Sequence, residues 1–391
     1  MSTRPNQVLS SMTPQLISAH SVSAFIVAIV SCLHPAVAAD NQRPNFVVIY
    51  TDDLQHGVTG FTGHPRGQLT PVLDAAAASG TVFTDAHVVY ALCGPSRAAL
   101  LSGKYGSRNG MMDFQTRMKP QPTFVSRLRD DGYQTNVVGK WHINLTPEQA
   151  GFQTWTTFHG NGPYYNRTVN DNGTDRTAHK LIDEFCTDIS TEFLRRAAET
   201  NSPFLLLHAT QLPHMDGQRK WPARPESLGR ISPGSVTLPR NWNDDLAGKP
   251  PYLSTVRNRR VAFEEYGYQN PEKLRQHTQQ YHAVTTEMDS ALAPLFATLR
   301  ETGLDRNTYV FMMSDNGWMM GEHGMTSKML AYEACTRVPF FVSGPGIRSA
   351  RCDELVLNID IAPTVLDIAG LPVPERMQGR SLVPLLNLKA E

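Results

Sequence analysis

The chain has 391 residues, of which 40% are hydrophobic and 18% are charged, so it can bury a sizeable core. Its 36 Lys and Arg balance its 36 Asp and Glu, which gives a formal net charge of zero at pH 7. This balance excludes a protein-wide basic field. We therefore expect no nucleic acid partner, although one local pocket can still be basic.

The first 38 residues have the pattern of a leader for export. An apolar run from Val22 to Leu33 is shorter than a transmembrane helix needs. The small residues Ala36 to Ala38 follow it, as a signal peptidase requires. We expect a signal peptide over residues 1–38, export to the periplasm or the medium, and no transmembrane span. A lipid anchor at Cys32 and retention of the segment are the alternatives.

Apolar, β-branched runs and amphipathic runs alternate along the rest of the chain. The apolar runs predict buried strands at 44–53, 81–90, 134–142, 203–214, 307–317 and 337–346. The amphipathic runs predict helices at 70–80, from about 96 onwards, and at 122–133, 183–199 and 271–303. The alternation predicts an α/β fold with a mostly parallel central sheet and helices on both faces. Residues 215–269 lack periodicity and predict a long surface segment of the kind that shapes a pocket.

Acidic residues follow two of the predicted strands directly. Asp52 and Asp53 end the first, and Asp315 and Asn316 end a later one. Adjacent carboxylates repel each other, and a cation would remove that cost. Oxygen ligands select a hard cation, calcium or magnesium, over zinc. Each pair taken alone can also be a solvated turn, but strand ends in an open α/β sheet are where ligands bind.

Basic side chains accompany the same strand ends. Arg97 follows Cys93 by one helical turn, so both can face one pocket. Arginine, lysine and histidine side chains beside a divalent metal suit a tetrahedral oxyanion such as sulfate or phosphate. Taken singly, each is as well explained as a surface charge or a satisfied histidine. The candidates are Arg97, Lys140, His142, His214, His323 and Lys328.

Cys93 lies in the turn "CGPSRAALLSG", which raises a question about its role. It can be half of a disulfide, a nucleophile, a metal ligand or the precursor of another group. The stretch resembles the Cys-x-Pro-Ser-Arg signature of the type I, formylglycine-dependent sulfatases of the alkaline-phosphatase-like superfamily. The segments "DD", "GKWH", "PH", "DNG", "GEHG" and "GRSLVPLL" occur in the order that this family has.

The resemblance covers about Asn45 to Leu386 and implies a sulfatase catalytic domain over residues 44–386. It implies an alkaline-phosphatase-like fold with one calcium ion. It also implies that a maturation enzyme reads the motif on an exposed turn and oxidises Cys93 to formylglycine. Relatives in the family usually continue into a small C-terminal subdomain, and we expect it to be missing or shortened here, because the sequence stops at Glu391. The implied metal ligands are Asp52, Asp53, residue 93, Asp315 and Asn316.

The function that the resemblance implies is hydrolysis of sulfuric esters, as in arylsulfatases, through a covalent sulfo-enzyme intermediate. The hydrated formyl group would attack sulfur, with Arg97 favouring its ionised oxygen and Lys140 holding it. Lys328 and His214 would hold the sulfate and help protonate the leaving alcohol. His142 would take a proton from the second hydroxyl so that sulfate leaves.

Two other functions stay open at this point. The first is a phosphonate or phosphate ester hydrolase of the same superfamily. The second is a truncated, non-catalytic protein that binds glycans.

Because we expect the protein to be exported, we expect its substrate to be a sulfated small molecule or glycan outside the cell, such as a sulfated polysaccharide. Trp221, Trp242 and Arg224 in the 215–269 segment can grip a sulfated sugar, or can serve local packing. A disulfide among Cys186, Cys335 and Cys352 is compatible with an oxidising compartment, but the sequence does not give its pairing.

Overall fold

The computed structural model describes residues 43–64 and 69–386. The predicted leader over residues 1–38, with Cys32, lies outside the described residues. The described residues fall within one compact unit.

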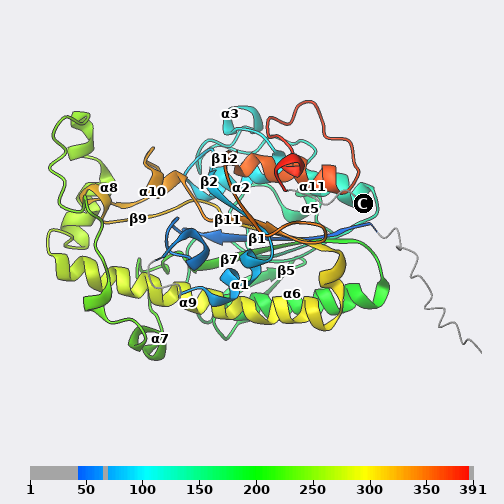
Figure 1. Ribbon diagram of the computed structural model, residues 1–391, viewed down its shortest axis with the longest axis horizontal. Coiled ribbons are helices and arrows are strands. Elements are labelled where there is room, and N and C mark those ends of the chain that lie inside the picture. Colours follow the sequence, from blue (N-terminus) through cyan, green and yellow to red (C-terminus); the bar gives the residue numbers. More distant parts are fainter. Residues whose placement is uncertain (1–42, 65–68, 387–391) are drawn as a thin grey trace, which may run out of the picture. The chain divides into compact units, whose positions relative to one another are not determined.

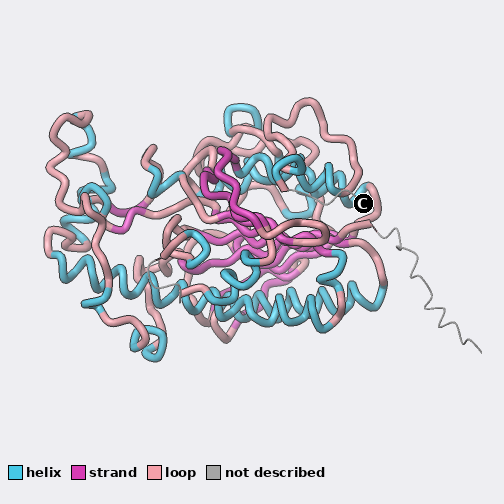
Figure 2. The backbone as a smooth tube through the Cα atoms, viewed as in Figure 1, coloured by secondary structure: helices cyan, strands magenta, loops and turns pink. Residues whose placement is uncertain are grey.

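A ten-stranded sheet forms the centre of this unit (Figures 1 and 2). Within it only β11 and β5 run against the other strands, so the prediction of a mostly parallel sheet is confirmed. A separate two-stranded ribbon pairs β9 (Met319–Met320) with β10 (Thr326–Ser327). In spatial order the sheet contains β12 (Ala350–Leu357), β2 (Thr81–His87), β11 (Phe340–Ser343), β8 (Thr308–Ser314), β1 (Asn45–Asp52), β7 (Phe204–Pro213), β3 (Gln134–Lys140), β4 (Thr154–Phe158), β5 (Arg167–Asp171) and β6 (Thr174–Ala178).

Helices cover both faces of the sheet, as predicted, and Figure 1 shows them on its two sides. The helices α2 (Cys93–Ser102), α4 (Phe124–Asp130) and α11 (Ile361–Ile368) pack on one face. The helices α1 (Pro71–Ala78), α6 (Ile182–Thr200) and α9 (Pro271–Glu301) pack on the other. The shorter helices are α3 (Gly106–Asn109), α5 (Pro147–Ala150), α7 (Pro225–Gly229), α8 (Arg257–Arg260) and α10 (Glu333–Thr336).

The central strand β1 explains why its sequence is apolar without interruption. Successive side chains of a strand point to opposite faces. Phe46, Val48 and Tyr50 therefore join the core under α2 and α11, whereas Val47 and Ile49 join the core above α9. Both faces are buried, so a continuous apolar run is required.

Four strands of the sheet were not predicted, namely β4, β5, β6 and β12. The side chains of β6 are mostly exposed, as are those of β12, so neither strand shows the apolar run of a buried one. The dipeptide Asn172-Gly173 between β5 and β6 is a hairpin turn signal that could have identified this pair. The helix after Cys93 also begins at Cys93 itself, three residues earlier than predicted.

The parallel central strands end at one edge of the sheet. In the register, Thr51 of β1 is opposite Ser314 of β8, and Asp52 is opposite Pro213 of β7. Strand β3 ends at Lys140 on the same side. The polar residues that follow these strands are therefore brought together, as the sequence predicts.

Gly139, the residue before Lys140, is required by the packing of β3 against β7. Its φ is 105°, and a Cβ there would lie 1.8 Å from the Ala209 carbonyl oxygen. We expect Gly139→Ala to lower the free energy of unfolding by more than about 2 kcal/mol in urea titrations. Gly173→Ala is the matched control, because Gly173 has a φ of 91° but open space around it. It should cost about 1 kcal/mol from the backbone alone, and equal losses at both positions would contradict the clash.

Candidate active site

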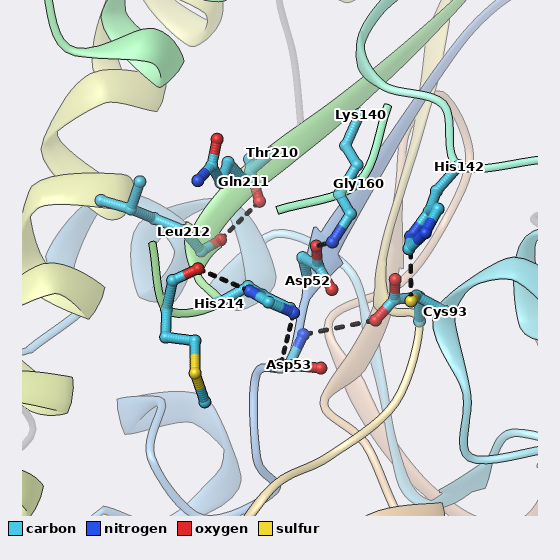
Figure 3. A network of polar contacts seen from close by, with 12 residues as sticks. Asp52, Asp53, Cys93, Lys140, His142, Gly160, Thr210, Gln211, Leu212 and His214 are labelled. Atoms are coloured by element: carbon cyan, nitrogen blue, oxygen red, sulfur yellow. Dashed lines mark hydrogen bonds and ion pairs between the residues drawn. The ribbon is translucent and has the colours of Figure 1, made fainter. Parts of the chain in front are cut away.

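A cavity of about 710 Å³ lies where these strand ends meet. Cys93, His142, His214 and Lys328 are among the residues that line it. Figure 3 shows His142 next to Cys93, with Asp52 and Asp53 between Cys93 and His214. The structure thus brings together every residue to which the family resemblance gives a catalytic or metal-binding role: Asp52, Asp53, Cys93, Arg97, Lys140, His142, His214, Asp315, Asn316 and Lys328.

Cys93 occupies the first turn of α2, which is buried along its whole length. Pro95 is tolerated there because the first N–H groups of a helix have no partner within it, and Gly103 ends the helix with a φ of 63°. Cys93 is 2% exposed and lies in the cavity wall. The expectation of an exposed turn is therefore wrong: small residues allow α2 to sink into the core, and Cys93 is reached only through the cavity.

His142 lies directly over Cys93. Its Nδ1 is 3.1 Å from the Cys93 Sγ, and its ring stacks on Phe114 at a centroid distance of 4.7 Å. The residue has a φ of 52°, which is a strained conformation for a non-glycine residue. Gly94 permits this close approach, because a Cβ there would lie 3.0 Å from the His142 carbonyl oxygen.

Three buried carboxylates each face a cation. Lys140 pairs with Asp52, and Lys328 pairs with Asp53. The Arg97 guanidinium donates to Asp315 Oδ2 from Nε at 2.9 Å and from Nη2 at 2.7 Å. A third donation from Arg97, 2.7 Å to the Lys140 carbonyl oxygen, connects α2 to the end of β3.

The pKa values of these carboxyls reflect their crowding. Burial and then the neighbouring charge of Asp52 raise the pKa of Asp315 to about 7. Burial likewise raises the pKa of Asp53, although Lys328 opposes the shift. Burial acts in the same direction on Asp52, but the surrounding positive charges outweigh it and lower that pKa. Burial and the mutual repulsion of the carboxylates therefore disfavour their charged forms, even though a cation faces each of them.

Burial also shifts the pKa values of the two histidines and the cysteine of the site. It lowers the pKa of His142 to about 2, with Lys140 as the second cause. It holds the pKa of His214 well below its usual value for the same two reasons. Burial raises the pKa of the Cys93 thiol. Both imidazoles are therefore neutral proton acceptors at pH 7, and the unmodified Cys93 is a thiol rather than a thiolate.

The residues present fit a hard divalent cation. Asp52 Oδ1 and Asp53 Oδ2 are buried without a hydrogen-bond donor in the described part of the chain. Possible ligand atoms of Asp52, Cys93 and Asp315 lie within 4.8 Å of one another, as do those of Asp52, Asp53 and His214. A carboxylate-rich set with unsatisfied oxygens suits calcium or magnesium.

Two residues that support the site were missed by the sequence analysis. Asp183 of α6 accepts the backbone N–H groups of Gln211 and Leu212 at 2.8 and 2.9 Å, just before His214. Asn358 donates to the Ser96 carbonyl at 3.2 Å and to its hydroxyl at 3.0 Å, which holds the first turn of α2. Both are common residue types in unremarkable stretches, so only the tertiary contacts identify them.

Other candidates lie elsewhere. His323 contacts Asp244 and Asn241 and is absent from the cavity lining. Trp221 is buried against Tyr266 and Tyr281, so it serves local packing. The other two residues that could have gripped a sugar, Trp242 and Arg224, also lie outside the cavity lining. Trp242 packs on the core, and Arg224 pairs with Glu184.

A family model described as Sulfatase matches residues 44–371, which is most of the chain. The chain belongs to the sulfatase family. It is a sulfuric ester hydrolase of the alkaline-phosphatase-like superfamily, as the Cys93 motif predicts. This family generally uses calcium and formylglycine, and the buried acidic site is compatible with both.

Relatives of this sulfatase match it over most of its length. It is 28% identical to the N-acetylglucosamine-6-O-sulfatase of Bacteroides thetaiotaomicron, over 92% of this chain and 74% of that protein. It is 30% identical to the human N-acetylglucosamine-6-sulfatase, over 96% of this chain and 70% of that protein.

Solved structures give the same fold. A protein bound to its substrate D-glucosamine-2-N,6-O-disulfate superposes with a TM-score of 0.78 at 29% identity, over 88% of this sulfatase and 80% of that chain. A phosphonate monoester hydrolase from Silicibacter pomeroyi superposes with a TM-score of 0.72 at 21% identity, over 89% and 77%. The second likeness shows a shared fold only.

Two further findings concern cysteine pairing and membrane spans. The described cysteines Cys93, Cys186, Cys335 and Cys352 are all unpaired in the structure. Among the described residues, no helix has the length and apolar character needed to cross a bilayer.

Asp183 offers a test of how the end of β7 is held. Burial raises its pKa to about 7, and its two oxygens accept two backbone N–H groups. Asp183→Asn turns an amide NH2 toward a backbone donor, so we expect a loss of about 1–3 kcal/mol of unfolding free energy in urea titrations. Asp188→Asn is the control on the same helix, since Asp188 is exposed and pairs only with Lys180 at the surface. It should stay within about 0.5 kcal/mol of the wild type. An unaffected Asp183→Asn would contradict the role given to this carboxylate.

Proposed function

We propose that this sulfatase releases sulfate from carbohydrate sulfate esters, with Cys93 converted to formylglycine and one calcium ion bound beside it. The observation that carries the proposal is the gathering of cationic and imidazole groups around position 93, above three buried carboxylates. Such donors suit a tetrahedral anion, because charge-assisted hydrogen bonds to oxyanions are short and strong. The groups are Arg97, Lys140, His142, His214 and Lys328.

The calcium would be held by Asp52, Asp53, Asp315, Asn316 and residue 93. The two unsatisfied carboxylate oxygens support this ligand set, as does the raised pKa of Asp315, which burial and the neighbouring charge of Asp52 cause. When bound, the ion supplies positive charge that polarises the sulfate ester and offsets the repulsion among the carboxylates.

At position 93, formylglycine supplies an oxygen nucleophile in its hydrated form. His142 would accept a proton from a hydroxyl at that position, a role supported by the 3.1 Å between its Nδ1 and the Cys93 Sγ, which stands in for that oxygen. Arg97 and Lys140 lie one layer deeper, where their charge favours an ionised oxygen at position 93.

Lys328 and His214 would bind the sulfate group itself. Both line the cavity, so their side chains can reach a ligand there. Lys328 remains charged because the carboxylates around it raise its pKa, although burial opposes the shift. One of the two would return a proton to the leaving alcohol.

A carbohydrate is the substrate class that the comparisons favour. Two relatives are named for the 6-sulfate of N-acetylglucosamine, and one structural neighbour was solved with a disulfated glucosamine. A cavity of about 710 Å³ accommodates a ligand of one or two sugar units. Sulfate is favoured over phosphonate because the relatives at 28–30% identity are sulfatases, whereas the phosphonate hydrolase is 21% identical. Parallel assays on aryl sulfate and aryl phosphonate would separate the two.

We further propose that residues 44–386 form the catalytic domain and that the protein is exported, to the periplasm or the medium. One relative is named as an extracellular sulfatase of Drosophila melanogaster. A formylglycine-generating enzyme would meet the chain before or during export, because the folded Cys93 is accessible only through the cavity.

The maturation of Cys93 can be read by mass spectrometry. Co-expression with a formylglycine-generating enzyme should make the tryptic peptide 67–97 lighter by the difference between a CH2SH and a CHO group, and reactive with hydrazide. Cys93→Ala should lose at least about 1,000-fold of the sulfate release. Cys352→Ala is the control, since Cys352 lies on β12. An unmodified Cys93 in a fully active protein would refute the proposal.

Calcium should stabilise the folded protein. Ligand binding adds about 2.7 kcal/mol when the free ion is roughly 100-fold above its Kd, so thermal unfolding should shift upwards on adding calcium and return with a chelator. Asp53→Asn should remove most of this shift. The exposed Asp305→Asn should keep it. A wild-type Tm that is indifferent to calcium and to chelator would contradict a calcium site.

A further inference from the structure

The cavity extends from Cys93 to a wall that no residue of the proposed chemistry occupies. Segment 215–269 contributes Arg219 and Arg257 to this wall, which also contains Asn258 and Tyr266. Among the described residues that line the cavity there is no Asp or Glu. A wall with two guanidinium groups and no carboxylate favours negative charge on whatever lies against it.

Arg257 is the cation of this wall that is free to bind a ligand. It lies on α8, where Arg259 donates to the His323 carbonyl at 2.7 Å and Arg260 pairs with Glu264 at 3.6 Å. The Arg257 side chain makes no hydrogen bond or ion pair with a described residue. The N–H donors of its guanidinium group are therefore available to a ligand in the cavity.

Arg219 is committed more strongly within the protein. Its Nη1 lies 2.8 Å from Glu265 Oε2, so that carboxylate compensates its charge. We therefore expect Arg219 to contribute less than Arg257 to the recognition of an anion.

Asn258 fixes this wall relative to the sulfate-binding end. Its Nδ2 donates to the Thr326 carbonyl at 2.8 Å and to the Lys328 carbonyl at 2.9 Å. The residue next to Arg257 is thus tied to the backbone of Lys328, the proposed sulfate ligand. The position of Arg257 relative to a sulfate bound by Lys328 is therefore fixed by these hydrogen bonds.

Much of the other cavity lining is apolar. Phe114, Tyr266 and Trp318 line the cavity together with Val256 and Val261. Ring faces of aromatic residues pack against the C–H faces of a sugar. The cavity therefore combines basic groups with apolar surface on which a sugar ring can pack.

We propose that Arg257 binds a second anionic group of the substrate, a sulfo group or a carboxylate, while the scissile sulfate lies on Lys328 and His214. This inference rests on the proposed function and extends it: the preferred substrate is a saccharide with two negative groups. A hydrogen-bonded contact with a charged group gives about a ten-fold gain in affinity over the monosulfated ligand. The gain should shrink with added salt, because Arg257 is exposed.

Binding can be measured without turnover. Calcium-loaded Cys93→Ala protein would be titrated calorimetrically with N-acetylglucosamine 6-sulfate, with glucosamine N,6-disulfate, and with a disaccharide that joins glucuronate to the 6-sulfated sugar. We expect at least one of the doubly charged ligands to bind about ten-fold tighter. The disulfate identifies a sulfo group as the second anion, and the glucuronate disaccharide identifies a carboxylate.

Substitutions on α8 then decide the assignment. In the same background, Arg257→Ala should remove the affinity ratio between doubly and singly charged ligands, and Arg257→Lys should keep part of it. Arg260→Ala should leave the ratio intact, since Arg260 pairs with Glu264 and does not line the cavity. A ratio that survives Arg257→Ala in a protein with wild-type Tm, or the absence of any ratio, overturns the inference.

Sulfate release by the matured wild type separates this outcome from the proposed function. Release from the monosulfated sugar without any preference for a second anion overturns the Arg257 inference and leaves the sulfatase proposal standing. A binding ratio that depends on Arg257, without release from any sulfate ester, supports the inference and refutes the proposed chemistry.

Discussion

The site depends on the compensation of three carboxylates that are buried side by side. Removing an ion from water costs several kcal/mol, and it is repaid only by close partners with good geometry. The fold supplies these partners from different elements, one for each carboxylate, and leaves two oxygens without a donor. These two unsatisfied oxygens allow the site to bind a divalent cation. The pairs are Asp52 with Lys140, Asp53 with Lys328, and Asp315 with Arg97.

The site also contains strained backbone. Asp53 has a φ of 63° and His142 a φ of 52°, conformations that cost free energy for residues with a Cβ. Around Asp53 the cost is offset by a hydrogen bond of 2.7 Å from the Tyr281 hydroxyl to its carbonyl and by the Lys328 ion pair. The strain is therefore maintained by the tertiary structure, which pre-organises the site before any ligand arrives.

The predictable part of the molecule is the part in which one physical requirement acts on contiguous residues. The buried run Phe46–Tyr50 had to be a two-sided strand, and the polar residues after such strands had to share an edge. The exposed strand β6 has no such requirement, so its sequence does not identify it. Asp183 and Asn358 act through atoms far away in the chain, and the burial of Cys93 follows from how α2 packs. Local patterns carry none of that information.

The floor and the wall of the cavity originate in different kinds of structure. The floor, which contains Asp52, Asp53 and Asp315, is held by strand ends and by buried charge pairs that tolerate little displacement. The wall belongs to segment 215–269, whose short helices can vary in sequence without disturbing the sheet. Asn258 joins the two, because its amide donates to the backbone beside Lys328. Side chains of the wall that face the cavity can therefore select the substrate, whereas a shift of α8 itself would be transmitted to the lysine that we assign to the sulfate.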